Sequence, residues 1–399
     1  MKLTLFDHPT IREGLLPFTF TRPVATLRSG ILTLAEKWSA VLGADISFLT
    51  ADYLREKFPE SDSPDSLYVN GGLLADEDLA AEITGLAPGE VLIAEDGIAL
   101  AFRDSRQYAA ELIAGQIPDG WHTRNPSMPF RMLRRPWDIF LMNGDEIRRD
   151  FNRITRGRKS ETVDDRHTIV YGDDIFIEAG VRIKAAVLNS EQGPIYLGRG
   201  AEIGEGSVVR GPFVLGENSS LNLGSRIRGD NSIGPGCKVG GELSNSVFLA
   251  NSNKAHDGYL GNSIIGEWCN IGAGTVASNM KNNMQPVKLW NYRSGVPENT
   301  GLLFCGLMMA DHAKCAINTA FNTGTVVGVG ANIFGNGTPP SYIPNFAWGG
   351  ASGFQTYRFD KFLDTVSAAM QRRNRVLAEV DIRILSHIFG LNTILPEQA

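Results

Sequence analysis

Three side chains capable of acid–base and polar chemistry lie close together in the stretch NSNKAHDGYLGNSIIGEWCNIGAGTVASN, residues 251–279. They are Lys254, His256 and Tyr259. A histidine with a pKa near 7 can take a proton from an attacking nucleophile, and such general base catalysis typically contributes ~10²–10⁴-fold. A purely structural histidine is the alternative, so the surroundings of His256 must decide between the two interpretations.

The surroundings have a period of six. Aliphatic residues recur at Leu197, Ile203, Val209, Leu215, Leu221, Ile227, Ile233 and Val239, and a second series runs through Met309, Cys315, Phe321, Val327 and Ile333. This period fits neither a helix nor a simple strand, but it fits short strands joined by tight corners. Stacked coils would place these side chains about 4.8 Å apart in one column. The sequence therefore predicts a parallel β-helix.

The stretch around His256 lies where this period slips, between Val239 and Ile265. An irregular coil inside a regular solenoid can form the wall of a pocket. The slip alone leaves both interpretations of His256 open, the structural one and the functional one.

The regions on either side of the β-helix have other patterns. Residues 1–157 alternate strand-like and helix-like segments and end in a charged linker helix, which is typical of an α/β domain. The β-helix is expected over residues 158–355. Residues 356–399 have helical periodicity and are predicted to be helices that cap the solenoid.

Composition excludes several classes of protein. The net charge of −6 over 399 residues disfavours a general binder of nucleic acid or anionic membranes. The four cysteines form no C-x-x-C pair, and the N-terminus lacks the apolar core of a signal peptide. No run of ~18 apolar residues suggests a membrane span. We expect a cytoplasmic protein that acts on small molecules.

The stretch resembles the acetyltransferase half of a known family, the bifunctional N-acetylglucosamine-1-phosphate uridylyltransferase/glucosamine-1-phosphate acetyltransferase (GlmU-like) family. The shared pattern is His256, Tyr259-Leu260-Gly261, the run Asn270–Thr275 (NIGAGT) and Asn279. The chain is most similar to a shorter bacterial variant with a divergent nucleotidyltransferase domain. The resemblance implies a left-handed β-helix and makes His256 the catalytic base.

Further roles follow from the same resemblance. The expected sugar-phosphate contacts are Arg228, Lys254, Tyr259 and Asn270. The positions expected near acetyl-CoA are Ala273, Asn279 and Gly306. The family has a lysine where this chain has Ser244, and Lys254 is the candidate to supply that charge. A metal site is the rival interpretation of the histidine, but only His256 and His312 lie inside the coils, and a catalytic zinc needs three protein ligands.

A second motif lies near the N-terminus, in REGLLPFTFTRPVATLRSGILTLAEKW. It resembles the signature of sugar-nucleotide pyrophosphorylases, in which backbone amides and basic side chains hold a triphosphate. The nucleotide-binding candidates are Arg12, Thr19, Arg22, Lys37 and Asn70. The G-x-G of that signature is absent, and Asn70-Gly71-Gly72 replaces the metal-binding aspartate segment. Asn143 and Asp145 are the candidates for Mg²⁺. The alternative is an α/β domain that binds without catalysis.

Together these features predict a bifunctional enzyme. It would transfer acetyl from acetyl-CoA to glucosamine-1-phosphate and join the product to UTP. The alternatives are another nucleotidyltransferase, such as a thymidylyltransferase, with a structural β-helix, and a non-catalytic scaffold or sensor. The nucleotide and sugar stay open.

The family resemblance also implies a homotrimer with shared sites. Residues 280–301 interrupt the period of six and are expected to form a long loop. This loop carries Lys281, Lys288 and Arg293, which suit the phosphates of CoA, and Trp290, which could pack on a neighbouring subunit.

Overall fold

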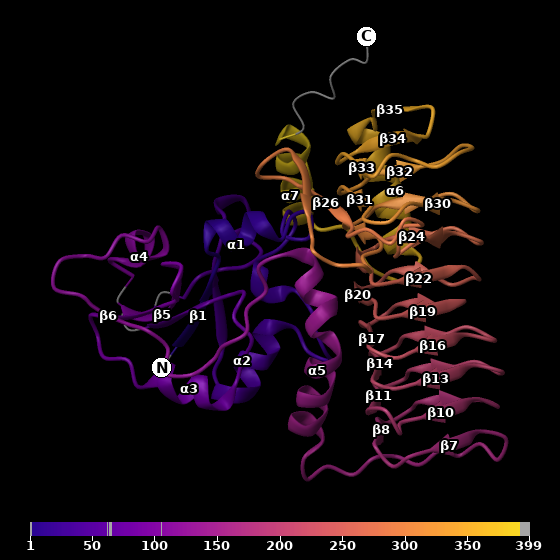
Figure 1. Ribbon diagram of the computed structural model, residues 1–399, viewed down its shortest axis with the longest axis horizontal. Helices are drawn as coiled ribbons and strands as arrows, with labels where there is room; N and C mark the ends of the chain where they lie inside the picture. The colour runs from indigo at the N-terminus through magenta and orange to yellow at the C-terminus, as the bar shows by residue number, and fades with distance from the viewer. Residues whose placement is uncertain (1, 62, 64–65, 105, 392–399) are drawn as a thin grey trace. The chain divides into compact units, whose positions relative to one another are not determined.

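The computed structural model describes residues 2–61, 63, 66–104 and 106–391, which form two compact units (Figure 1). The first unit comprises the residues up to Leu27 together with Leu32–Arg135. The second comprises Arg28–Ile31 and the residues from Pro136 onward. The linker helix, expected at the end of the N-terminal domain, is therefore part of the same unit as the β-helix.

The first unit is an α/β fold built on one mixed sheet. Its strands, in sheet order, are β2 (Ile46–Leu49), β1 (Lys2–Phe6), β3 (Ser66–Asn70), β5 (Ala99–Asp104), β4 (Glu90–Ile93) and β6 (His122–Arg124). The central strands β1 and β3 pair in parallel and are buried almost throughout, as expected for strands covered on both faces.

Short helices complete this unit. They are α1 (Pro9–Gly14), η1 (Val24–Thr26), α2 (Leu34–Leu42), η2 (Asp52–Leu54), α3 (Glu77–Thr84) and α4 (Ala109–Ile113). Helix α2 shows how the sequence sets its limits. Thr33 and Glu36 cap its N-terminus reciprocally, and Gly43 ends it with φ 59°.

The second unit is a parallel β-helix whose coils contribute strands to three sheets (Figure 1). The first sheet contains β7 (Ile169–Tyr171), β10 (Val187–Asn189), β13 (Val208–Arg210), β16 (Arg226–Arg228), β19 (Glu242–Ser244), β22 (Tyr259–Gly261), β25 (Val276–Ala277) and β30 (Ala320–Phe321). The second sheet contains β8 (Ile175–Ile177), β11 (Ile195–Leu197), β14 (Phe213–Leu215), β17 (Asn231–Ile233), β20 (Val247–Ala250), β23 (Ile264–Glu267), β28 (Met308–Met309), β31 (Val326–Val327) and β33 (Tyr342–Ile343).

The third sheet carries Lys254 and Asn270 of the candidate site. It contains β9 (Arg182–Ile183), β12 (Glu202–Ile203), β15 (Ser220–Leu221), β18 (Lys238–Val239), β21 (Asn253–Lys254), β24 (Asn270–Ile271), β29 (Lys314–Cys315), β32 (Asn332–Ile333), β34 (Ala347–Gly350) and β35 (Gly353–Thr356). Corners of three or four residues join most coils of this sheet to the first sheet, for example 255–258 between β21 and β22, whereas only Gly240 and Gly241 separate β18 from β19.

The predicted column of aliphatic side chains is confirmed. All residues of both six-residue series are buried in one continuous hydrophobic cluster inside the coils. Their stacking follows from the register, in which Ile203 pairs with Leu221 and Leu221 with Val239. Burial of this column supplies the main driving force for the solenoid.

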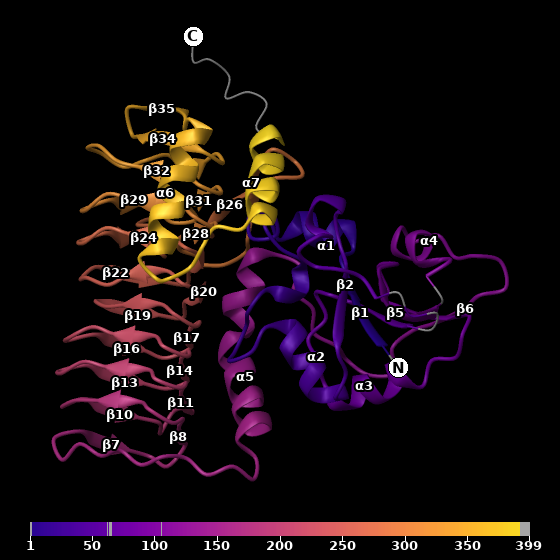
Figure 2. The same ribbon diagram turned by 180° about the vertical axis from the view of Figure 1, so that it is seen from behind.

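Three helices and a β-hairpin lie outside the coils of the second unit. The helices are α5 (Pro136–Thr155), α6 (Phe359–Gln371) and α7 (Glu379–Leu391), and the hairpin strands are β26 (Lys288–Asn291) and β27 (Val296–Asn299). Helix α5 packs along the second sheet, whereas α6 lies over the coils toward their C-terminal end (Figure 2). The predicted C-terminal helices are therefore confirmed.

Candidate functional site

His256 lies at an exposed corner of the β-helix. The corner follows β21 of the third sheet and precedes β22 of the first sheet. It needs Gly258, whose φ of 127° favours glycine and whose missing Cβ would lie 1.9 Å from the carbonyl oxygen of Thr275. The tight backbone at Gly258 thus fixes the corner while the His256 side chain stays exposed.

Lys254 has a different role from the expected one. Its register partner is Val239, so it occupies a position of the inward-facing column, and only 1% of its surface is exposed. Its Nζ donates to the main-chain oxygens of Gly240 (3.2 Å) and His256 (2.6 Å). Burial lowers the pKa of this ammonium group to about 8. Lys254 therefore anchors the His256 corner from inside and does not present its charge to a sugar phosphate.

Tyr259 belongs to a polar cluster on the first sheet. The Asn279 amide donates to the Tyr259 hydroxyl at 2.9 Å and to Asn262 Oδ1 at 2.8 Å. Burial raises the pKa of the Tyr259 phenol, so the hydroxyl stays neutral and able to hydrogen-bond a ligand. Tyr259 and Asn279 were expected in separate roles, whereas their side chains are hydrogen-bonded to each other in the structure.

Arg228 lies on the same sheet. Its guanidinium donates to Glu242 Oε1 at 3.1 Å, and Glu242 is the register partner of Tyr259. The Arg228 side chain is 67% exposed and keeps donors that face solvent. The structure thus places Arg228, Glu242 and Tyr259 on adjacent strands.

The other candidates around His256 divide between two regions. Asn270 and Ala273 line a hollow on the third-sheet side, away from Tyr259. Gly306 lies near Asn279, because its amide donates to the Asn262 carbonyl and the Cys305 amide donates to the Asn279 carbonyl. A Cβ at Gly306 would lie 2.1 Å from the carbonyl oxygen of Gly261, so glycine is required for packing there.

Two hollows meet at His256. One, of about 700 Å³, lies between the third sheet and α6, and the other, of about 790 Å³, lies over earlier coils. Lys238, Ala255 and His256 line both. A base at this boundary can contact two ligands held on opposite sides. Lys238 and the residues of α6 were not predicted from the sequence, because no local pattern shows which coil faces a helix far away in the chain.

The loop that interrupts the coils folds onto its own chain. Trp290 of β26 stacks on Tyr342 of β33, with ring centroids 4.0 Å apart and planes 12° from parallel. Lys281 donates to the main-chain oxygen of Pro286 at 2.9 Å. The loop thus packs on its own coils through one face of the Trp290 ring, and packing of Trp290 on a neighbouring subunit stays a prediction.

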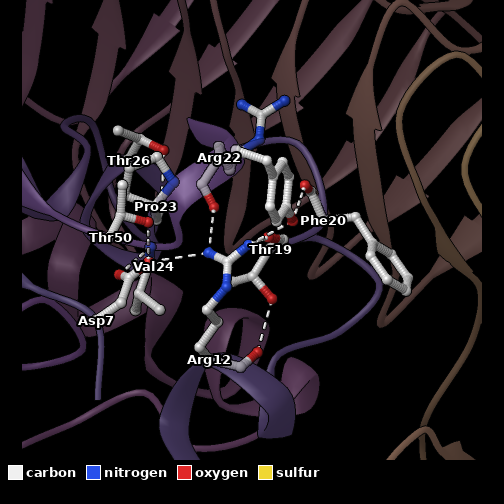
Figure 3. Close-up of polar contacts among 10 residues, drawn as sticks. Asp7, Arg12, Thr19, Phe20, Arg22, Pro23, Val24, Thr26 and Thr50 are labelled. Carbon is white, nitrogen blue, oxygen red and sulfur yellow. Dashed lines mark hydrogen bonds and ion pairs between the residues drawn. The ribbon is translucent and has the colours of Figure 1, made fainter. Parts of the chain in front are cut away.

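In the first unit, Arg12 is the centre of a network of polar contacts (Figure 3). Its guanidinium pairs with Asp7 at 2.9 Å and donates to the main-chain oxygens of Thr19 and Arg22 and to the Tyr53 hydroxyl. Only 14% of the Arg12 side chain is exposed. These contacts hold the 17–24 segment against α1, so this charge is used within the fold.

The remaining nucleotide-binding candidates are also enclosed. Thr19 donates to the Arg12 carbonyl, Lys37 and Asn70 have no exposed surface, and Arg22 is 8% exposed. Asn70 donates to the Ala99 carbonyl and accepts from the Gly72 amide, so its side chain shapes the turn after β3. These side chains do not form an open basic site in this conformation.

The two candidates for Mg²⁺ do not fit that role. The Asn143 amide oxygen accepts hydrogen bonds from the Gly30 amide and the Ser232 hydroxyl, and its nitrogen donates to the Asp230 carbonyl. Asn143 therefore fixes α5 to the second sheet. Asp145 is 79% exposed on that helix, and its partner is Arg148 at 3.9 Å. Among the described residues, no three His, Cys, Asp or Glu side chains group in a way that could hold a metal ion.

Two further expectations concern thiols and membranes. All four cysteines are buried and free, as the sequence predicts for structural thiols. In the described ranges, no helix is long and apolar enough to cross a membrane.

Comparison with known proteins gives partial matches. Residues 3–159 match the family described as "Sugar nucleotidyl transferase". The chain is 37% identical over 87 residues to the "Bifunctional protein GlmU" of Methanocaldococcus jannaschii, which covers 22% of this chain and 21% of the relative. The protein of that name from Wigglesworthia glossinidia brevipalpis is 27% identical over 214 residues, or 49% of this chain and 40% of the relative.

A third relative is the "Bifunctional sugar-1-phosphate nucleotidylyltransferase/acetyltransferase" of Sulfurisphaera tokodaii, 31% identical over 93 residues, or 23% of each chain. The matches thus span less than half the length of these relatives. Among solved structures, the polySia specific acetyltransferase NeuO matches 58% of this chain and 98% of its own at 14% identity, with a TM-score of 0.28.

Proposed function

Residues 3–159 carry a sugar nucleotidyl transferase domain and the chain is GlmU-like, and from this premise we propose that the protein synthesises a sugar nucleotide. Its β-helix transfers acetyl from acetyl-CoA to glucosamine-1-phosphate. Its first unit transfers uridylyl from UTP to the N-acetylglucosamine-1-phosphate so formed. The observation that carries the acetyl transfer is the exposed His256 at the boundary of two hollows.

The proposed reaction needs only the groups found there. The free amine of the sugar attacks the thioester carbonyl, and a ring nitrogen of His256 accepts the proton lost by the amine. The new C–N bond forms as the C–S bond breaks, and the CoA thiolate leaves and takes up a proton. Tyr259 and Arg228 donate hydrogen bonds to the sugar phosphate, since both present polar groups on the first sheet beside the His256 corner.

The assembly that we propose is a homotrimer with small-molecule substrates only. The four buried, free thiols agree with a reducing compartment such as the cytoplasm. No step is assigned to Mg²⁺, because Asn143 and Asp145 do not offer a site for it.

A release assay tests acetyl transfer. Free CoA thiol should appear from acetyl-CoA only when glucosamine-1-phosphate is present. His256→Ala should lower the rate by ~10²-fold or more without unfolding the protein. His167→Ala is the matched control, because His167 is also exposed but lies just before β7, the first strand of the solenoid. A His256→Ala rate equal to wild type would remove His256 as the base.

A second candidate has structural support in the first unit. There the basic side chains are enclosed and Arg12 is used internally, which favours a domain that binds a ligand without nucleotidyl transfer. An assay of pyrophosphate release distinguishes a nucleotidyltransferase from a domain that only binds its ligand. It pairs UTP, dTTP and other nucleotides with a panel of sugar-1-phosphates. Release with UTP and N-acetylglucosamine-1-phosphate supports bifunctionality. Release with dTTP alone supports a thymidylyltransferase, and no release with any pair supports the non-catalytic domain.

A further inference from the structure

The groove between the third sheet and α6 has a one-sided charge. Lys238 and Lys314 contribute from the sheet, Arg372 and Arg373 from the end of α6, and His256 lies at the rim. Among the described residues that line it there is no Asp or Glu. This is unusual for a chain with a net charge of −6. A hollow lined by cations alone is expected to attract anions.

The adjoining hollow provides a contrast. It also contains cations, but Glu202, Glu205 and Asp257 line it with them. Mixed charges suit a ligand that carries both an ammonium group and a phosphate. The two hollows therefore differ in the ligand charge that each can accept, although they share the His256 corner.

Two of the four cationic side chains of the groove are held by hydrogen bonds within the chain, and the other two are not. Arg373 donates to Asn253 Oδ1 at 2.6 Å and to the Gly236 carbonyl, and Lys314 donates to the His312 carbonyl at 3.0 Å. Arg373 thereby ties the end of α6 to the coils. The side chains of Lys238 and Arg372 have no hydrogen-bond or ion-pair partner within the described part of the chain, and both residues are exposed.

We propose that this groove binds the phosphate groups of the acyl donor, with Lys238 and Arg372 as their ligands from opposite walls. The assignment rests on the proposed acetyl transfer and adds a site for the donor within one chain. The Ala368 and Ala369 methyl groups of α6 offer an apolar wall for the thin pantetheine arm, and the thioester end reaches His256 at the rim. Several phosphates on one ligand match two free cations better than the single phosphate of a sugar does.

Equilibrium binding to the full-length protein tests the assignment. CoA and glucosamine-1-phosphate are titrated separately into wild type, Lys238→Ala, Arg372→Ala and the double variant. Each single change should weaken CoA about tenfold, the scale of one charge-assisted hydrogen bond. Arg372→Ala should also leave glucosamine-1-phosphate binding unchanged, because Arg372 lines this groove and not the adjoining hollow. Arg375→Ala and Lys361→Ala are the matched controls, because both side chains are exposed near α6 and neither lines the groove.

The outcomes separate this proposal from the acetyl transfer. If wild type binds CoA and both variants bind it equally well, the groove assignment is wrong while acetyl transfer stands. If Arg372→Ala loses glucosamine-1-phosphate binding and keeps CoA binding, the groove holds the acceptor and the assignment is overturned. If wild type binds no CoA, both the acetyl transfer and the assignment fail. Weakened CoA binding in the variants but not in the controls supports both.

Discussion

The ammonium group of Lys254 donates a 2.6 Å hydrogen bond to the main-chain carbonyl of His256, the residue at the boundary of the two hollows. A second hydrogen bond, to Gly240, joins this corner to the preceding coil. A buried lysine is costly unless its donors are satisfied. Its position inside the aliphatic column therefore indicates that Lys254 holds the His256 corner in place, which makes it a positioning residue.

Lys254→Met should separate stability from activity. Methionine fills the same space without the charge, so the gain from removing a buried ammonium group offsets the two lost hydrogen bonds, and the melting temperature should change little. Acetyl transfer should fall ~10-fold or more, because the His256 backbone loses its anchor. Lys361→Met, an exposed change on α6, is the control. An unchanged rate in Lys254→Met would contradict the positioning role.

The pH dependence of stability gives an independent signature. The pKa of Lys254 is lowered from 10.5 to about 8 in the folded protein. Between those pH values the unfolded chain binds more protons, so the free energy of unfolding should rise with pH through this group, by at most about 3 kcal/mol. Lys254→Met should lack that rise. The free energies of unfolding of wild type and Lys254→Met are measured at pH 7.5 and pH 10. If they differ by the same amount at both pH values, the lowered pKa of Lys254 is disproved.

Gly258→Ala should disrupt the corner itself. The added Cβ would lie 1.9 Å from the Thr275 carbonyl oxygen, at a φ of 127° that alanine rarely adopts. We expect a loss of about 2 kcal/mol or more in unfolding free energy, together with lost acetyl transfer. Gly206→Ala is the control, since Gly206 has φ 74° but no atom closer than 3.9 Å to the added Cβ. An equal loss of unfolding free energy in Gly258→Ala and Gly206→Ala would contradict the role of close packing at Gly258.

The sequence predicted the β-helix because each side of a coil contributes one inward-pointing side chain about every six residues. Neither an α-helix nor an ordinary β-strand has that period. The same period predicts that Lys254 points inward, because it lies six residues before Leu260 of the buried column. The inward position of Lys254 was not recognised, because the unbroken period of six ends at Val239. The corners that follow Val239 are shorter than the others, but the buried column continues through Leu243 and Phe248. A charged residue at a core position was the signal that was missed.

The N-terminal motif predicted the domain but not the environment of its side chains. Spacing identified Arg12 and Asn70 as basic and polar groups of a phosphate site, yet the fold uses both in internal hydrogen bonds. Such partners come from segments far apart in the chain, as with Tyr53 and Arg12, so no local pattern shows them. The same limit applies to Asn143, whose partners Gly30 and Ser232 lie on either side of it in sequence.

Arg12→Ala should destabilise the first unit. The change leaves the Asp7 carboxylate buried without its guanidinium and removes the contacts to Thr19 and Tyr53. Loss of one partner of such a pair costs about 3 kcal/mol or more. Arg55→Ala is the matched control, because its pair with Asp52 is exposed at the surface and should contribute little. Thermal unfolding measures both, and a wild-type melting temperature for Arg12→Ala would contradict the internal role.

The thiols should be unreactive in the native protein. Burial raises the pKa of Cys237 and Cys305 to about 12, so almost no thiolate is present at pH 8. A thiol reagent such as Ellman's reagent should therefore label the protein only after denaturation. Fast labelling of one thiol per chain under native conditions would show that a cysteine is accessible.

The last prediction concerns assembly. Leu223 and Ile317 are 71% and 68% exposed, and both lie at corners between the third and first sheets, the edge of the β-helix that carries His256. They also line the two hollows. If the proposed trimer forms along this edge, a neighbouring chain covers these side chains and completes the walls around His256. Leu223→Asp and Ile317→Asp should then give monomers in sedimentation and lose acetyl transfer, whereas Val376→Asp, 84% exposed between α6 and α7, should change neither. A wild-type monomer with full activity would show that one chain builds the site alone. Active trimers of both corner variants would place the interface on another face.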